Sequence, residues 1–190
     1  MATQAHVAQN QARTVSSETR STGGILDITS LVLLAVLLAA GYVLNFTLGN
    51  ALAMAGIKPQ FIIAAYALAA ALTRASALQA VVYGLLSAAV IQLTTSIPGL
   101  NFVTEVAGAL VMCGLARLDL EVAGRSVTPL VAAFLATLVS GALFAGLGTV
   151  IMGAELATAL AKAPIVLGTA AFNAVVVQAL YFPLRSVLKK

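Results

Sequence analysis

The chain has 190 residues, of which 61% are apolar and only 8% are charged, and its mean hydropathy is +1.05. A soluble domain carries roughly a quarter charged residues, and a water-soluble protein of this size could not hide so much apolar surface. The formal charge of +4 comes from scattered basic residues without a basic run, which indicates membrane topology and not nucleic acid binding. The composition therefore excludes a soluble domain and predicts an all-α integral membrane protein.

The first residues differ in kind from the rest of the chain. Residues 1–23 are rich in Gln, Ser, Thr and Ala and show no helical apolar stripe, which predicts a disordered cytoplasmic tail. The apolar stretch that follows starts too late and runs too long for a signal peptide. His6 lies in this tail and is not expected to take part in chemistry. Residues 24–190 are expected to form one transmembrane domain.

Six apolar segments follow the tail, and each is a candidate transmembrane helix. They cover residues 26–48, 59–73, 75–96, 100–116, 127–152 and 164–184. A helix needs about 20 residues to cross a bilayer, and the second segment falls short of this length. Gly49 to Gly56, just before it, are expected to form a loop that dips partly into the membrane.

The distribution of basic residues predicts the orientation of the six spans. An even number of spans puts both termini on one side, and cytoplasmic loops carry the excess of Lys and Arg. Eight basic residues fall on the side of the termini, and only Lys58 and Lys162 fall on the other. Both termini are therefore predicted to be cytoplasmic. The eight are Arg13, Arg20, Arg74, Arg117, Arg125, Arg185, Lys189 and Lys190.

The polar residues within the spans concentrate on the outer side. Polar side chains in a membrane are costly and tend to be functional. The inner halves are plainer, since Leu31–Ala40 has no polar residue and Leu110–Ala116 has only Cys113, expected to be a passive core residue. The outer cluster predicts a binding cavity open to the outside. It consists of Asn45, Gln92, Thr94, Thr95, Asn101, Thr104, Glu105, Thr169 and Asn173, with Gln178 deeper.

Glu105 is the most informative residue of this cluster, because a carboxylate about one turn inside a span must be neutralised, hydrated or paired. Either it accepts hydrogen bonds from an amine of a ligand, or it lies in interfacial water or pairs with Lys58 or Lys162 as a structural tie. Asn101 either contacts the ligand or N-caps the fourth span. The N-terminal end of that span would suit an anionic group.

The remaining candidates each have a structural and a functional reading. Asn173 either bridges helices or binds a ligand, and Thr94 and Thr95 can be satisfied by their own helix backbone. Tyr66 and Phe102 either stack on a ligand ring or pack in the core.

Two helix breaks are expected to form walls of the cavity. Pro98 and Gly99 predict a tight external turn between the third and fourth spans, and Lys162 and Pro164 begin the sixth span.

Several catalytic motifs are missing from the sequence. There is no GxxxxGK[ST] phosphate-binding loop, no GxSxG elbow and no cluster of metal-ligating residues, so we expect neither an enzyme nor a cofactor. The first span does carry Ala35 and Ala39 on one helix face, where small residues would let another helix approach closely. The same spacing recurs at Ala67 and Ala71.

These features together resemble a known family of transport subunits. Six short spans in under 200 residues, cytoplasmic termini, and Ala35 and Ala39 in the first span are similar to the substrate-binding S component of an energy-coupling factor (ECF) transporter. The resemblance implies an S-component-like bundle in the cell (inner) membrane of a bacterium or archaeon. Its partners would be a membrane-spanning T component, which docks on Ala35 and Ala39, and two cytoplasmic ATPases. The S component would capture its ligand from outside and topple in the membrane to release it inside.

Within that family the chain is most similar to the tryptophan-transporter group. Residues 117–162 match only in hydropathy. The group tends to have an acidic residue where this chain has Gln60, and an Asp-Lys pair where it has Glu105 and Val106. The resemblance is carried by Lys58-Pro59, by Leu93-Thr94-Thr95 with Pro98-Gly99 and Asn101, and by Thr169-Ala170-Ala171-Phe172-Asn173.

The resemblance implies that the ligand is tryptophan or a related aromatic compound. Glu105 would accept its ammonium group, and Lys58, Lys162 or the first amides of the fourth span would bind its carboxylate. Tyr66, Phe102 or Phe172 would contact its ring. The predicted substrate-binding residues are Glu105, Asn101, Asn173, Thr95, Gln92, Thr104, Thr169, Lys162, Lys58 and Asn45.

Other functions remain open at this point. One keeps the S component but changes the ligand to a vitamin or another small metabolite. A self-sufficient secondary carrier is a further alternative, although such carriers usually show internal repeats or discontinuous helices, and no convincing repeat is found. An assembly or scaffold protein would not need the outer polar cluster.

Overall fold

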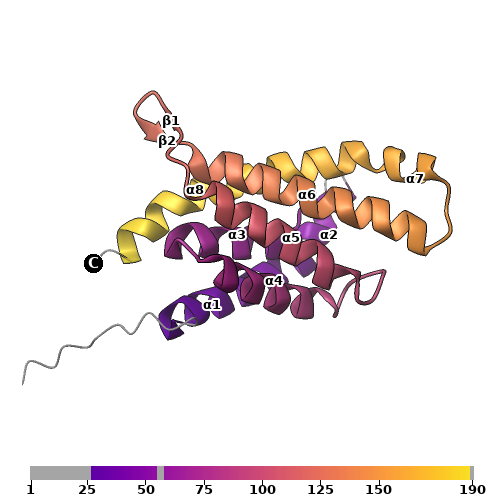
Figure 1. The fold of residues 1–190 in the computed structure, drawn as a ribbon, viewed down its shortest axis with the longest axis horizontal. Helices are drawn as coiled ribbons and strands as arrows, with labels where there is room; N and C mark the ends of the chain where they lie inside the picture. The colour runs from indigo at the N-terminus through magenta and orange to yellow at the C-terminus, as the bar shows by residue number, and fades with distance from the viewer. Residues whose placement is uncertain (1–26, 55–57, 189–190) are drawn as a thin grey trace, which may run out of the picture.

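A computed structural model describes residues 27–54 and 58–188 (Figure 1). The predicted tail over residues 1–23 lies outside the described residues, as do Lys189 and Lys190. The helices are α1 (Ile28–Leu44), the π-helix η1 (Asn45–Gly49), α2 (Asn50–Ala53), α3 (Phe61–Thr73), α4 (Ala77–Ile91), α5 (Leu100–Leu115), α6 (Thr128–Ile151), α7 (Leu156–Ala161) and α8 (Ala163–Leu188). A small antiparallel hairpin, β1 (Glu121–Val122) and β2 (Arg125–Ser126), joins α5 to α6.

The structure is mainly helical, as predicted, and its helices suit a membrane protein. Three helical stretches are long and apolar enough to cross a bilayer: Ile28–Ala53, Thr128–Ile151 and Leu156–Leu188. Three further apolar helices, α3, α4 and α5, are shorter, with 13, 15 and 16 residues. Each of the six predicted segments thus contains an apolar helix, and the six-span topology stays a prediction.

Three local expectations differ from the structure. The loop expected from Gly49 onward is wrong for residues 49–53, because the helix continues through η1 and α2 to Ala53. Neither the hairpin before α6 nor the short helix α7 before α8 was predicted. All three lie at the ends of spans, where hydropathy alone does not separate helix from connection.

The helix boundaries follow from capping chemistry. Asp27 starts α1, where its Oδ2 accepts hydrogen bonds from the Ser30 amide at 3.1 Å and the Ser30 hydroxyl at 2.9 Å. Ser76 and Gln79 form a capping box at the start of α4. Pro98 and Gly99 form the predicted turn before α5, and Gly99 has a φ of 85°, which favours glycine.

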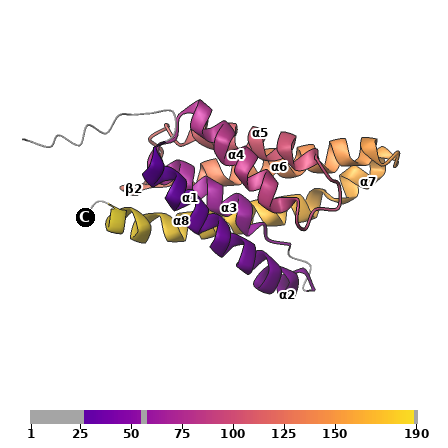
Figure 2. The ribbon, with the colours of Figure 1, turned by 90° about the horizontal axis from the view of Figure 1, so that it is seen from below.

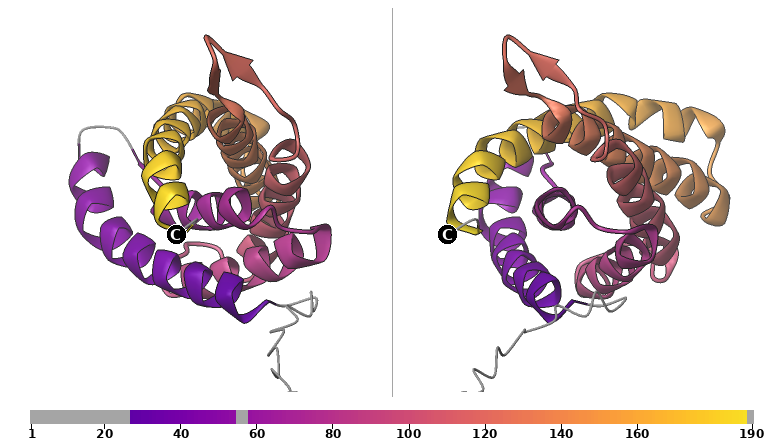
Figure 3. Two further views of the ribbon diagram at one scale, coloured as in Figure 1. Left: turned by 90° about the vertical axis from the view of Figure 1, so that its left-hand side faces the viewer. Right: turned by 60° about the vertical axis from the view of Figure 1, so that its left-hand side comes forward.

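Helix α3 lies in the middle of the bundle. It contacts α1, α4, α5, α6 and α8, and the end-on view in Figure 3 shows it encircled by the other helices. Every residue from Phe61 to Ala71 is buried. Its many alanines allow this, because small side chains let surrounding helices approach closely.

The two ends of the bundle carry different charges. The start of α1 and the end of α8 lie at the same end as the hairpin, whereas α2, the α4–α5 turn and α7 lie at the other (Figures 1 and 2). We call the first the arginine end, because it carries Arg74, Arg117, Arg125 and Arg185, and the second the lysine end, because it carries Lys58 and Lys162.

Gly84 shows how closely α4 and α5 approach, and replacing it with Ala should destabilise the protein. A Cβ at this position would lie 2.6 Å from Val106 Cα and 2.9 Å from the Glu105 carbonyl oxygen, both backbone atoms. Overpacking of this kind costs about 1–3 kcal/mol. We expect a lower midpoint of thermal unfolding in detergent. Gly114→Ala on α5 is the matched control, since a Cβ there meets nothing within 4 Å; equal midpoints for the two variants would contradict the tight α4–α5 contact.

Candidate functional site

A cavity of about 580 Å³ lies at the lysine end of the bundle. This volume falls within the ~300–1,000 Å³ range of small-molecule sites in proteins. Its walls come from α1, η1, α4, α5, α6 and α8, together with the segment that leads into α3. Helices far apart in sequence therefore enclose one space large enough for a small ligand.

The π-helix η1 helps to shape one wall of this cavity. Single turns of π-helix often occur at functional sites, because they shift side chains relative to a regular α-helix. Here η1 presents Asn45, Phe46 and Gly49 to the cavity, next to Tyr42 on α1. The wall thus combines an amide with two aromatic side chains.

Glu105 lies in the wall contributed by α5 and is only 3% exposed. Its Oε1 accepts hydrogen bonds from the Ser140 hydroxyl at 3.0 Å and the Thr104 hydroxyl at 3.4 Å. Its Oε2 and the hydroxyl of Tyr66 lie beside each other, but neither makes a hydrogen bond of good geometry. The carboxyl group therefore has one well-bonded oxygen and one oxygen that only neutral hydroxyl or amide groups of the protein approach.

The structural pairing of Glu105 with a lysine is not observed. Among the described residues, no Lys or Arg contributes to the environment of its carboxyl group. Lys58 is exposed and Lys162 is half-buried, and both line the cavity nearer to solvent than Glu105. Among the described residues, the Glu105 carboxyl therefore has only neutral neighbours.

Most of the predicted substrate-binding residues line this cavity. They come from three regions of the sequence that the fold brings together at the lysine end. They are Asn45, Lys58, Thr95, Asn101, Glu105, Lys162 and Thr169, with Thr94 beside them. Whether they bind a ligand stays a prediction, but they line one cavity.

Asn173 does not line the cavity and instead bridges helices, one of the two roles considered for it. It is fully buried, and its Nδ2 donates to the Gln60 carbonyl at 3.1 Å and to the Thr137 hydroxyl at 3.4 Å. Its Oδ1 has no partner. Asn173 thus fastens α8 to α6 and to the residue before α3.

Two more of the predicted residues hold the same segment, Lys58 to Phe61. Thr169 donates its hydroxyl to the Lys58 carbonyl at 2.8 Å. Asn45 Oδ1 accepts from the Phe61 amide at 2.8 Å, and its Nδ2 donates to Gln60 Oε1 at 3.4 Å. The segment is therefore clamped between η1 and α8, and this clamp fixes the backbone that carries Lys58.

Gln92, Thr104 and Asn101 have structural roles that the sequence did not separate from binding. Gln92 Oε1 accepts from the Gly99 amide at 2.9 Å and so fastens the α4–α5 turn, and Thr104 supports Glu105. The N-cap role considered for Asn101 is wrong, because Gly99 is the N-cap of α5. Asn101 lies in the first turn, where its Oδ1 accepts from the Thr95 hydroxyl at 2.6 Å.

The aromatic residues expected to meet a ligand ring are not in the cavity wall. Tyr66 is fully buried in α3, and Phe102 is 38% exposed on the outside of α5. Phe172 packs edge-on against Phe61, with 5.6 Å between ring centroids. The aromatic wall consists instead of Tyr42, Phe46 and Phe144, a set that depth along the span could not reveal.

Thr137 and Ser140 on α6 are polar residues of the cavity that the sequence reasoning missed. Both are about 1% exposed and line the cavity, and Ser140 binds Glu105. A signal was available, because they are three residues apart and so lie on one face of a helix. This face was overlooked because residues 117–162 were compared only by hydropathy.

Ala35 and Ala39, the predicted docking pair, are both exposed on α1. Val32, Val36 and Val43 are also exposed on this helix. No described part of the chain covers this face.

Comparison of the chain with known protein families, with curated proteins and with solved structures gives no match.

Proposed function

We propose that this protein is the membrane-embedded substrate-binding subunit of an importer of the ECF type. In this proposal all six apolar helices span the membrane, the arginine end faces the cytoplasm, and the lysine-end cavity opens to the outside. The excess of basic residues at the arginine end supports this orientation. In this proposal the subunit hydrolyses no ATP itself and docks on a T component powered by two ATPases.

The observation that carries the proposal is the Glu105 carboxyl in the wall of the cavity. It is almost fully buried, has an oxygen without a partner, and has no cation beside it among the described residues. A buried charge is stable only when it is paired or well hydrogen-bonded. A ligand with a protonated amine would supply the missing partner.

The remaining walls support a small ligand that combines an amine, an anionic group and an apolar or aromatic body. Lys58 and Lys162 offer ammonium groups for a carboxylate, while Tyr42, Phe46 and Phe144 offer aromatic surface. Tryptophan fits this description. A vitamin with a protonated amine shares the same chemistry, and the departures at Gln60 and Glu105 from the tryptophan group leave room for it.

The proposal is tested by isolating the full-length protein in detergent and identifying by mass spectrometry the small molecule that co-purifies. We expect an amine-bearing compound, and radiolabelled tryptophan should bind to the emptied protein and be displaced by the compound found. Affinity purification from the native membrane should also recover a T component and two ATPases. Uptake of the compound by the protein alone in vesicles would contradict the proposal and indicate a self-sufficient carrier.

A further inference from the structure

The arginine end contains a second pocket, separate from the lysine-end cavity. It lies where α3, α5 and α8 end and α6 begins, and its volume is about 170 Å³. It is smaller than the ~300–1,000 Å³ of ordinary small-molecule sites and suits a small polar group.

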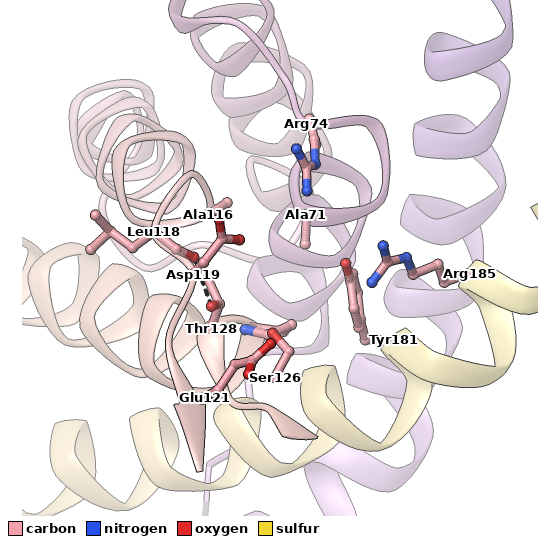
Figure 4. Close-up of a pocket in the computed structure, with 11 residues that line it drawn as sticks. Ala71, Arg74, Ala116, Leu118, Asp119, Glu121, Ser126, Thr128, Tyr181 and Arg185 are labelled. Carbon is pink, nitrogen blue, oxygen red and sulfur yellow. Dashed lines mark hydrogen bonds between the residues drawn. The ribbon is translucent and has the colours of Figure 1, made fainter. Parts of the chain in front are cut away.

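The pocket is lined by two cations and two anions that lie on different sides. Figure 4 shows Arg74 and Arg185 on the side of α3 and α8, and Asp119 and Glu121 on the side of the α5–α6 connection. In the part of the chain that the structure describes, neither arginine is hydrogen-bonded to either carboxylate across the pocket. The four charges sum to zero, yet they are separated in space.

Two features of the backbone and its neighbours place the arginines at this pocket. The Arg185 guanidinium lies over the ring of Tyr181, with Cζ 5.6 Å from the centroid. Arg74 ends α3 with a φ of 48°, a left-handed conformation that glycine adopts without strain and that other residues adopt at a cost. The Arg74 side chain extends from this helix end and lines the pocket.

We propose that this pocket binds the headgroup of a phospholipid that carries both a phosphate and a primary ammonium group, as in phosphatidylethanolamine. The guanidinium groups of Arg74 and Arg185 bind the phosphate, since arginine presents paired N–H donors to phosphate oxygens. Asp119 and Glu121 accept hydrogen bonds from the ammonium. The position fits, because the headgroups of the inner leaflet lie at the level where cytoplasmic helix ends emerge.

This assignment rests on the orientation given in the proposed function, with the arginine end at the inner leaflet, but not on the ligand of the lysine-end cavity. Exposed apolar side chains close to the pocket, Leu118 and Phe182 among them, would contact the acyl chains. A headgroup with phosphate alone would leave the two carboxylates facing an anion. A choline headgroup has no N–H to donate to them.

The test compares three lipids with identical acyl chains on the full-length protein by native mass spectrometry from detergent. These lipids are phosphatidylethanolamine, phosphatidylcholine and phosphatidylglycerol. We expect phosphatidylethanolamine to bind about tenfold more tightly than either of the others, a difference equivalent to about 1.4 kcal/mol. Equal affinity for all three lipids would overturn the proposal.

Variants then test which residues bind the phosphate and which bind the ammonium group. Arg185→Gln should lower the affinity for phosphatidylethanolamine about tenfold, whereas Arg185→Lys, which keeps the charge but loses the paired donors, should lower it less. The double variant Asp119→Asn with Glu121→Gln should remove the preference over phosphatidylglycerol. Arg125→Gln, an exposed change of the same charge in the hairpin outside the pocket, should leave all affinities unchanged.

Two results would point to another occupant. If phosphatidylglycerol bound best and gained affinity in the Asp119→Asn, Glu121→Gln variant, the pocket would be a simple anion site. If free phosphoethanolamine displaced the lipid at equal concentration, the ligand would be a soluble metabolite. Size-exclusion profiles that match the wild type show that a variant is folded, and the conservative Arg185→Lys keeps the test valid if Arg185→Gln does not fold.

Discussion

Replacing Glu105 with Gln should weaken the binding of an amine-bearing ligand by well over tenfold. The amide has the shape of the carboxyl group but no charge, so the cavity loses its partner for an ammonium group. A hydrogen bond to a charged group contributes about 1.5–3 kcal/mol, and every 1.4 kcal/mol changes the affinity tenfold. Equilibrium binding of the co-purified compound to the detergent-solubilised protein measures the effect.

The control for this experiment is Glu155→Gln. Glu155 is exposed before α7 at the same end of the bundle, lies outside the cavity wall, and its side chain makes no capping hydrogen bond. It should bind the ligand as the wild type does. If Glu105→Gln kept full affinity, the carboxyl group would have no role in binding. If it gave a higher unfolding midpoint together with full affinity, Glu105 would simply be a destabilising buried acid.

Replacing Ala35 and Ala39 together with Leu should abolish uptake while leaving ligand binding intact. The two alanines are exposed on α1 and do not line the cavity, so the added side chains point away from the described part of this chain. They would instead prevent a partner helix from approaching closely. Uptake in cells that carry the partner subunits and binding to the isolated protein are the two measurements.

A matched pair of substitutions separates docking from general effects on the membrane surface. Ala142→Leu on α6 with Ala171→Leu on α8 adds the same volume at exposed positions on other helices and should leave uptake unchanged. Loss of both uptake and binding in Ala35→Leu, Ala39→Leu would indicate misfolding. Full uptake by that variant would exclude this face of α1 as the docking surface.

The sequence predicted the helices well because hydropathy and capping act locally. The fourth span, expected over residues 100–116, is α5 at Leu100–Leu115, and the fifth, expected over 127–152, is α6 at Thr128–Ile151. Pro98 and Gly99 form the expected turn. The connections were less predictable, because the continuation of α1 through Ala53 and the hairpin after α5 depend on contacts that hydropathy does not describe.

The sequence predicted how far along each helix the site residues lie, but not which way their side chains point. Asn173 and Glu105 both lie at the lysine-end half of their helices, yet Asn173 points between α6 and α3 while Glu105 reaches the cavity. Phe102 lies at the same level of the bundle as the cavity, but its side chain is on the outer face of α5. The rotation of a helix about its axis is set by its neighbours, and a single sequence without homologues contains little information on those neighbours.

The central position of α3 has a consequence for how the protein is made. Its surroundings are completed by α8, which is made after the other described helices and also supplies the Thr169 and Asn173 contacts to the segment before α3. Until α8 is in place, one side of α3 is uncovered, and the segment from Lys58 to Phe61 lacks its hydrogen bonds from Thr169 and Asn173. The insertion of α8 should therefore both enclose α3 and complete the lysine-end cavity, so that a chain released before α8 is made is inserted but cannot bind.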